Sequence, residues 1–191
     1  MRHPELPTPL LALARRQEGL VSTRQCDREG VGKGRRQRLV ASGRAAVATH
    51  GVVDLAPLLH AEGWHDDEGP DHLRRRAATL ALLAHGHRAT SVGACALALM
   101  GVQGLPRLIR PEVMLPARSA RRGREGIVVR RFDDAMPTFE MGGFRVATPT
   151  WALAQAICEM DRDHAVAVLD SALHRGWIRE SDLGAVRGLA R

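Results

Sequence analysis

The chain has 191 residues, enough for one domain of ordinary size or two small ones, and its 28 Lys and Arg outnumber its 21 Asp and Glu. The resulting formal charge of +7 favours a polyanionic partner. No apolar run is long enough to cross a bilayer, and Pro4, Glu5 and Pro7 stand where a secretory signal would be apolar, so we expect a cytoplasmic protein without a membrane segment.

The amino-terminal residues predict three helices. Apolar positions recur at helical spacing over 6–14, behind a Thr8-Pro9 start. Ser22 and Gln25 have the spacing of a capping box that begins a second helix, and Gly30 stands where a left-handed residue would end it. A third helix follows the turn Val31-Gly32. It would direct outward the basic residues Lys33, Arg35, Arg36 and Arg38 and direct inward Leu39 and Val40.

A short β-hairpin is predicted directly after this basic helix. Segments 44–47 and 52–55 contain short apolar runs and flank the turn residues Thr49, His50 and Gly51. A helix, a tight turn, a basic helix and a hairpin are typical of a winged helix-turn-helix, whose second helix enters a DNA groove. We therefore assign residues 1–56 to a DNA-binding domain. The alternative for the same residues is a small helical hairpin whose basic face is merely solvated.

The segment 57–70 is polar and rich in glycine, and we interpret it as a linker. Residues 71–191 would form a second domain. Helical spacing predicts helices at 71–84, 91–100, 150–160, 163–174 and from Ser181 onward. Short apolar runs predict strands at 108–109, 113–115, 127–129 and 144–146, with a hairpin tip at 141–144. The expected fold class is α+β and mostly helical: an N-terminal winged helix-turn-helix, then a helical domain with a small antiparallel sheet.

Three stretches of the chain carry a resemblance to a known family. They are GLVSTRQCDREGV with LVASGRAAVATHGVVDL, then RATSVGACALALMGV, then GFRVATPTWALAQAICEMDRDHAVAVLDSALHRGWIRESDL. With them the chain resembles the AbiEi-type antitoxins and their actinobacterial relatives, the transcription-regulating half of type IV toxin-antitoxin systems. The family pattern is followed in the last stretch at Gly143, Val146, Thr148, Pro149 and Leu153. It is not followed at Trp151, Ala152 and Gln155, where relatives often have Arg, Thr and Asp.

The resemblance implies a winged helix domain that binds inverted repeats in double-stranded DNA near its own promoter, as a monomer or weak dimer. It also implies a second domain associated with neutralising a nucleotidyltransferase-like toxin. Carried over to matching positions, the DNA-contacting set would be Ser22, Thr23, Arg24, Lys33, Arg35, Arg36, Arg38, Arg44 and His50. Some arginines would neutralise phosphates while one or two read base edges. Some relatives continue into a nuclease, so a further alternative is a remnant of such a fused protein.

A second group of basic residues falls in the predicted loop and strand of the second domain. It consists of Arg118, Arg121, Arg122, Arg124, Arg130 and Arg131. The sequence leaves open whether this group extends a DNA footprint, grips RNA, faces an acidic protein or is only solvated. Aromatic residues are not interleaved among these arginines, which disfavours RNA binding by base stacking.

Motifs for catalysis, metal binding or cofactor binding are not found in the sequence. Cys26, Cys95 and Cys158 have no CxxC spacing, which indicates neither a zinc knuckle nor a disulfide framework. The segment GVGKGRR lacks the spacing of a phosphate-binding loop. Asp133, Asp134 and Glu140 lack a neighbouring lysine for a nuclease centre. We therefore expect a noncatalytic protein without a cofactor, either a DNA-binding regulator and antitoxin or a protein-interaction module built on a winged-helix scaffold.

Overall fold

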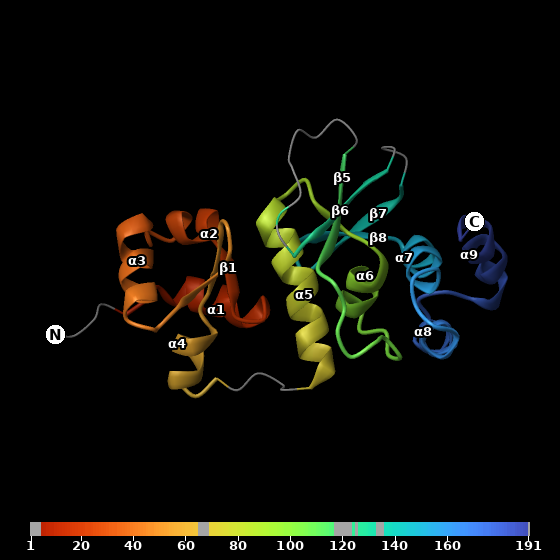
Figure 1. The fold of residues 1–191 in the computed structure, drawn as a ribbon, viewed down its shortest axis with the longest axis horizontal. Helices are drawn as coiled ribbons and strands as arrows, with labels where there is room; N and C mark the ends of the chain where they lie inside the picture. The colour runs from red at the N-terminus through yellow and green to blue at the C-terminus, as the bar shows by residue number, and fades with distance from the viewer. Residues whose placement is uncertain (1–4, 65–68, 117–123, 125, 133–135, 191) are drawn as a thin grey trace. The chain divides into compact units, whose positions relative to one another are not determined.

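The computed structural model describes residues 5–64, 69–116, 124, 126–132 and 136–190 (Figure 1). The chain divides into two compact units, Met1–Glu68 and Gly69–Arg191, each an α+β structure with its own hydrophobic core. Among the described residues, every helix is too short or too polar to span a membrane.

The first unit contains four helices and a three-stranded sheet within its described residues. Its elements are α1 (Thr8–Arg16), β1 (Leu20–Ser22), α2 (Thr23–Arg28), α3 (Lys33–Ala41), β2 (Ala46–Thr49), β3 (Val52–Asp54) and α4 (Ala56–Ala61). The sheet order is β1-β3-β2 with antiparallel neighbours. The predicted β2–β3 hairpin is confirmed. Strand β1 was not predicted, because three residues are too few to show an alternating pattern.

The core of the first unit forms where α1, α2, α3 and the sheet meet. Leu10 of α1, Cys26 of α2 and Leu39 of α3 are buried in it. Leu58 and Leu59 of α4 are buried in the same core, so a helix occupies the start of the segment that was predicted to be a linker. Burial of these two leucines keeps that part of the chain with the first unit, because each buried side chain contributes about 1.5–3 kcal/mol.

The second unit begins with the long helix α5 (Pro70–His85) and continues, in its described part, through five strands, four more α-helices and the short 3-10 helix η1 (Glu180–Asp182). The elements are β4 (Thr90–Ser91), α6 (Gly93–Leu99), β5 (Glu112–Pro116), β6 (Val128–Phe132), β7 (Thr138–Met141), β8 (Phe144–Ala147), α7 (Pro149–Ile157), α8 (Arg162–His174) and α9 (Leu183–Leu189). Helix α6 packs against both α5 and α7, and its Leu97 is fully buried. The predicted helices of this unit are confirmed, with shifted ends.

The sheet of the second unit is mixed, so the predicted small antiparallel sheet is wrong. Its five strands lie in the order β6-β5-β4-β8-β7, and the pairs β4–β8 and β5–β6 are parallel. The predicted hairpin tip is confirmed in β7–β8, where Met141 pairs with Phe144. The central strand β4 has two residues and leaves no sequence pattern, which is why the parallel arrangement was missed. No strand forms at residues 108–109.

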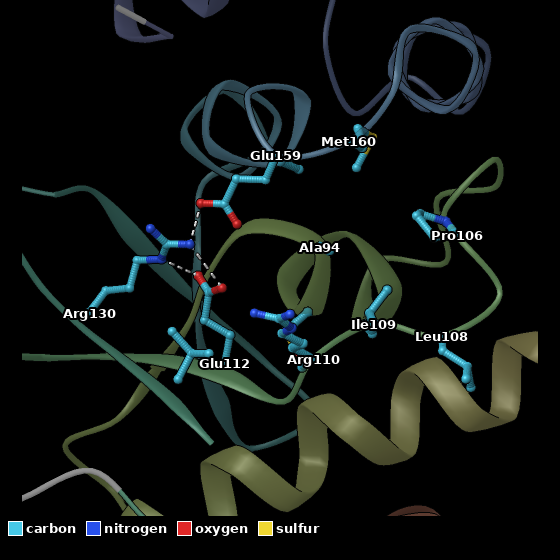
Figure 2. A pocket seen from close by; sticks show the side chains of 12 residues that line it. Ala94, Pro106, Leu108, Ile109, Arg110, Glu112, Arg130, Glu159 and Met160 are labelled. Atoms are coloured by element: carbon cyan, nitrogen blue, oxygen red, sulfur yellow. Dashed lines mark hydrogen bonds and ion pairs between the residues drawn. The ribbon is translucent and has the colours of Figure 1, made fainter. Parts of the chain in front are cut away.

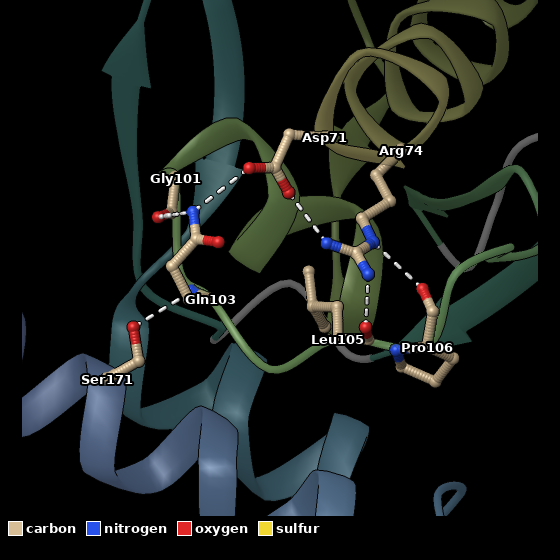
Figure 3. A network of polar contacts seen from close by, with 7 residues as sticks. All are labelled: Asp71, Arg74, Gly101, Gln103, Leu105, Pro106 and Ser171. Carbon is tan, nitrogen blue, oxygen red and sulfur yellow. Dashed lines mark hydrogen bonds and ion pairs between the residues drawn. The ribbon is translucent and has the colours of Figure 1, made fainter. Parts of the chain in front are cut away.

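A polar network fixes the connection between α6 and β5 (Figure 3). From α5, Arg74 donates through Nε to the carbonyl oxygen of Pro106 at 2.8 Å, through Nη1 to Asp71 at 2.6 Å, and through Nη2 to the Leu105 carbonyl. Gln103 donates to Asp71 at 3.1 Å. Burial alone would raise the pKa of Asp71, but the hydrogen bonds from Gln103 and Arg74 outweigh it and lower that pKa. One arginine therefore anchors the loop to α5.

Candidate nucleic-acid interface

Helix α2 begins at the predicted capping box. The Ser22 hydroxyl accepts a hydrogen bond from the Gln25 backbone N–H at 3.2 Å, and the Gln25 side chain accepts one from the Ser22 N–H at 2.7 Å. Gln25 also donates to the side chain of Gln17 at 2.9 Å, and Gln17 donates to the Leu20 carbonyl at 2.9 Å. Ser22 is thus already used to start α2 and to hold it beside β1, although it was predicted as a DNA contact.

Arg36 closes the turn between α2 and α3. Its Nη1 donates to the Val31 carbonyl at 2.7 Å and also forms an ion pair with Asp27, the penultimate residue of α2. The side chain is only 13% exposed. Gly30, in the turn, has φ of +73°, as expected for the residue that ends a helix in the left-handed region. The prediction that Arg36 points outward is wrong, because two acceptors of the turn hold its guanidinium.

Arg35 is also turned away from the outer face of α3. Its Nη2 donates to the carbonyl oxygen of Glu5 at 2.6 Å, which ties α3 to the segment that precedes α1. The side chain is half-buried. Two of the four basic residues of α3 therefore support the fold of the first unit.

The outer face of α3 consists of a continuous arc of exposed residues. They are Lys33, Gly34, Gln37, Arg38 and Ala41. At 100° per residue these positions cover about 140° of the helix circumference, opposite the buried Leu39. The side chains of Lys33 and Arg38 form no ion pair or hydrogen bond with any described residue. Gln37 was missed in the sequence analysis, although its spacing from Gly34 and Ala41 could have revealed it.

The β2–β3 hairpin lies beside this face and is tied to the start of α2. The Thr23 backbone N–H donates to the Gly51 carbonyl at 2.9 Å, and Gly51, with φ of +82°, forms the hairpin turn together with the exposed His50. A groove of about 490 Å³ runs between α3 and the hairpin, with Lys33 and Gln37 on its helix side. On the hairpin side Val47 is 66% exposed, so the groove has an apolar wall.

Two more predicted contact residues carry charges that face no acidic partner. Arg24 is exposed on α2, and Arg44 is half-buried between α3 and β2. Like Lys33 and Arg38, they make no ion pair within the described part of the chain. Four of the predicted contact residues, together with Arg28 at the end of α2, therefore carry cations without a described ion pair in the single stretch of α2, α3 and the entry to β2. We call Arg24, Lys33, Arg38 and Arg44 the basic set.

Only three arginines of the second predicted basic group, Arg124, Arg130 and Arg131, lie within the described residues. Arg118, Arg121 and Arg122 lie outside the described residues. Arg124 forms a β-bridge with Ile127, and Arg131 is exposed on β6. The Arg130 guanidinium donates two hydrogen bonds to the Glu112 carboxylate, from Nε at 2.8 Å and from Nη2 at 3.3 Å. It also forms an ion pair with Glu159. Its charge is therefore compensated.

These three side chains meet in a cavity of about 550 Å³ in the second unit (Figure 2). Figure 2 shows Glu112, Arg130 and Glu159 pointing toward one another, with Ile109 and Met160 among the apolar lining. Burial raises the pKa of Glu112, although the Arg130 guanidinium opposes the shift. Gln155 donates to the same carboxylate at 2.5 Å. The polar groups are mutually satisfied, which is typical of a structural ion pair.

The thiols and the acidic side chains of the described residues form no reactive cluster. Burial raises the pKa of Cys26 to about 11 and that of Cys95 to about 12, so both are unreactive as thiolates at neutral pH. The described residues contain no group of His, Cys, Asp and Glu arranged to hold a metal ion. Within the described residues, the exposed face of α3, the hairpin and the basic set form a surface suited to an anionic partner. No protein-family model matches this chain, and no curated protein matches it.

Proposed function

We propose that the first unit binds double-stranded DNA as a winged helix-turn-helix, with α3 in a groove and the β2–β3 hairpin as the wing. The observation that carries the proposal is the outer arc of α3, which holds Lys33 and Arg38 free of acidic partners and is followed at once by the hairpin. The succession of α1, α2, α3 and a β-hairpin is the arrangement that such domains use.

The charges of the basic set match the partner. Duplex DNA carries one negative charge for about every 1.7 Å of its axis, and each phosphate neutralised by a protein cation releases counterions. Four such contacts by Arg24, Lys33, Arg38 and Arg44 correspond to a slope of about −4 for the logarithm of the binding constant against the logarithm of salt concentration. Arg35 and Arg36 do not add to this slope, because they support the fold.

The resemblance to AbiEi-type antitoxins supports a more specific role. We infer a noncatalytic transcriptional regulator that represses its own promoter from inverted repeats and acts, in the cytoplasm, against a nucleotidyltransferase-like toxin. If a nucleotidyltransferase gene lies beside the gene for this chain, coexpression of the two tests the antitoxin part, since restored growth of the host is expected. Failure to restore growth would leave a regulator without antitoxin activity.

The DNA-binding proposal is tested by fluorescence anisotropy with the whole chain. The probes are a labelled duplex from the region upstream of its gene and a duplex of the same composition in shuffled order, each titrated across a salt series. We expect tighter binding to the upstream duplex that persists at physiological salt. Equal binding to both duplexes that salt abolishes would contradict sequence-specific regulation.

A second candidate function is a protein-interaction module. The apolar wall of the α3–hairpin groove favours it, because Val47 exposes 66% of its surface there. Replacing Lys33 and Arg38 by alanine separates the two functions. The double variant loses DNA if the arc binds DNA, whereas capture of a protein through Val47 would persist.

A further inference from the structure

The exposed arc of α3 has a charged residue at each edge and small residues at its centre. At 100° per residue, Lys33 and Arg38 lie about 140° apart, and Gln37, Gly34 and Ala41 lie between them. A Cβ atom added to Gly34 would meet only the Arg38 Nη1, at 3.7 Å. The Arg38 guanidinium therefore reaches over Gly34, and Gln37 is the only long side chain that starts between the two cations.

The chemistry of Gln37 differs from that of its neighbours. Its amide offers one acceptor and two donors, it is exposed, and it makes no hydrogen bond with any described residue. An uncharged amide adds little to phosphate binding. In the major groove, however, a glutamine matches the N7 acceptor and the N6 donor of adenine with two hydrogen bonds.

Two arginines of α3 are less suited to reading bases. Arg35 and Arg36 are engaged by the Glu5 carbonyl, by Asp27 and by the Val31 carbonyl. Gly34 and Ala41 let the helix backbone approach the floor of a groove, and the Ala41 methyl offers the apolar contact that a thymine methyl accepts. The A·T pair is thus the base pair that the centre of the arc fits.

We propose that Gln37 is the base-reading residue of α3 and selects an A·T pair in each half-site, while Lys33 and Arg38 hold the flanking backbone. This inference rests on the DNA binding proposed above. It assigns specificity to an uncharged residue at the centre of the arc and assigns affinity to the cations at its edges.

The experiment compares four proteins on one set of duplexes. A binding site is first selected with the wild-type chain from a randomised duplex library, and each of its base pairs is then replaced in turn. Gln37→Ala should erase a preference of about 5- to 150-fold for adenine at one position per half-site and leave the other positions unchanged. Gln37→Glu should move that preference to cytosine, whose N4 amino group donates to a carboxylate.

Lys33→Ala is the matched control on the same arc. It should weaken binding to every duplex alike and lower the salt slope by about 1, without changing base preference. Because Gln37 and Lys33 have no described partner, all variants should melt with the wild type. If the wild type selects a site and Gln37→Ala retains every base preference, the inference is overturned while DNA binding stands. If the wild type selects no site, the proposed function itself fails.

Discussion

Replacing Arg36 with alanine should lower the free energy of unfolding of the first unit without removing a DNA contact. The substitution removes a charged hydrogen bond to the Val31 carbonyl, which contributes about 1.5–3 kcal/mol, and an ion pair with Asp27, which adds at most about 1 kcal/mol because that carboxylate is 57% exposed. The expected loss is therefore about 2–4 kcal/mol. For a unit of this size, that loss lowers Tm by roughly 10–30 °C.

Scanning calorimetry of the whole chain measures this loss, and anisotropy on the upstream duplex, at a temperature where both proteins are folded, measures DNA affinity. Arg38→Ala is the matched variant on the same helix, since Arg38 is exposed and has no described partner. It should melt within about 0.5 kcal/mol of the wild type and bind DNA more weakly. If Arg36→Ala instead melted like the wild type and lost DNA binding, the division of α3 into an inner and an outer face would be refuted.

Three further predictions concern Gly104, Glu112 and the three thiols. Gly104→Ala should destabilise the second unit by roughly 2–5 kcal/mol in urea unfolding, because φ is +87° and the new methyl would lie 2.6 Å from the Ala167 Cβ. Gly142→Ala is the control: its φ is +58°, no atom lies within 4 Å of the new methyl, and the expected loss is only about 1–2 kcal/mol. Because the pKa of Glu112 is raised in the folded state, the protonated carboxyl of Glu112 adds to the free energy of unfolding of the second unit. This contribution is complete below about pH 4.3, the ordinary glutamate pKa, and is lost as pH rises through the raised pKa. Glu112→Gln should flatten that part of the unfolding profile, and an unchanged profile would contradict the shift. A thiol reagent at neutral pH should modify Cys158 quickly and the two buried thiols only on unfolding, so fast modification of all three would contradict their burial.

Local signals in the sequence predicted the elements that are built from local interactions. The capping box at Ser22 and the left-handed Gly30 lie at the two ends of one short helix, and the β7–β8 hairpin pairs residues that are close in the chain. The mixed sheet of the second unit could not be predicted in this way. The parallel pair β4–β8 joins strands that are distant in sequence, and the parallel pair β5–β6 joins consecutive strands that show no signal for a parallel arrangement. Strand β4 contributes only Thr90 and Ser91 to the centre of the sheet.

The same limit explains which residues of the candidate interface were misplaced. Helical spacing alone separates Leu39 from Lys33 and Arg38, because burial follows the period of the helix. It does not reveal that the Val31 carbonyl and Asp27 engage Arg36, or that the Glu5 carbonyl engages Arg35. These acceptors come from other segments, and only the folded chain brings them to the arginines.

The number of arginines in a basic helix therefore overstates the charge that it offers to a partner. Of the four cations of α3, two are directed at backbone or carboxylate oxygens of the first unit, and two remain at the edges of the outer arc. An arginine that holds its own turn is less able to donate to a base, because leaving Val31 would expose a buried acceptor without a donor. The side chains of the outer arc that the fold does not use are those of Lys33, Arg38 and Gln37, and Gln37 is the uncharged one that we propose reads the base.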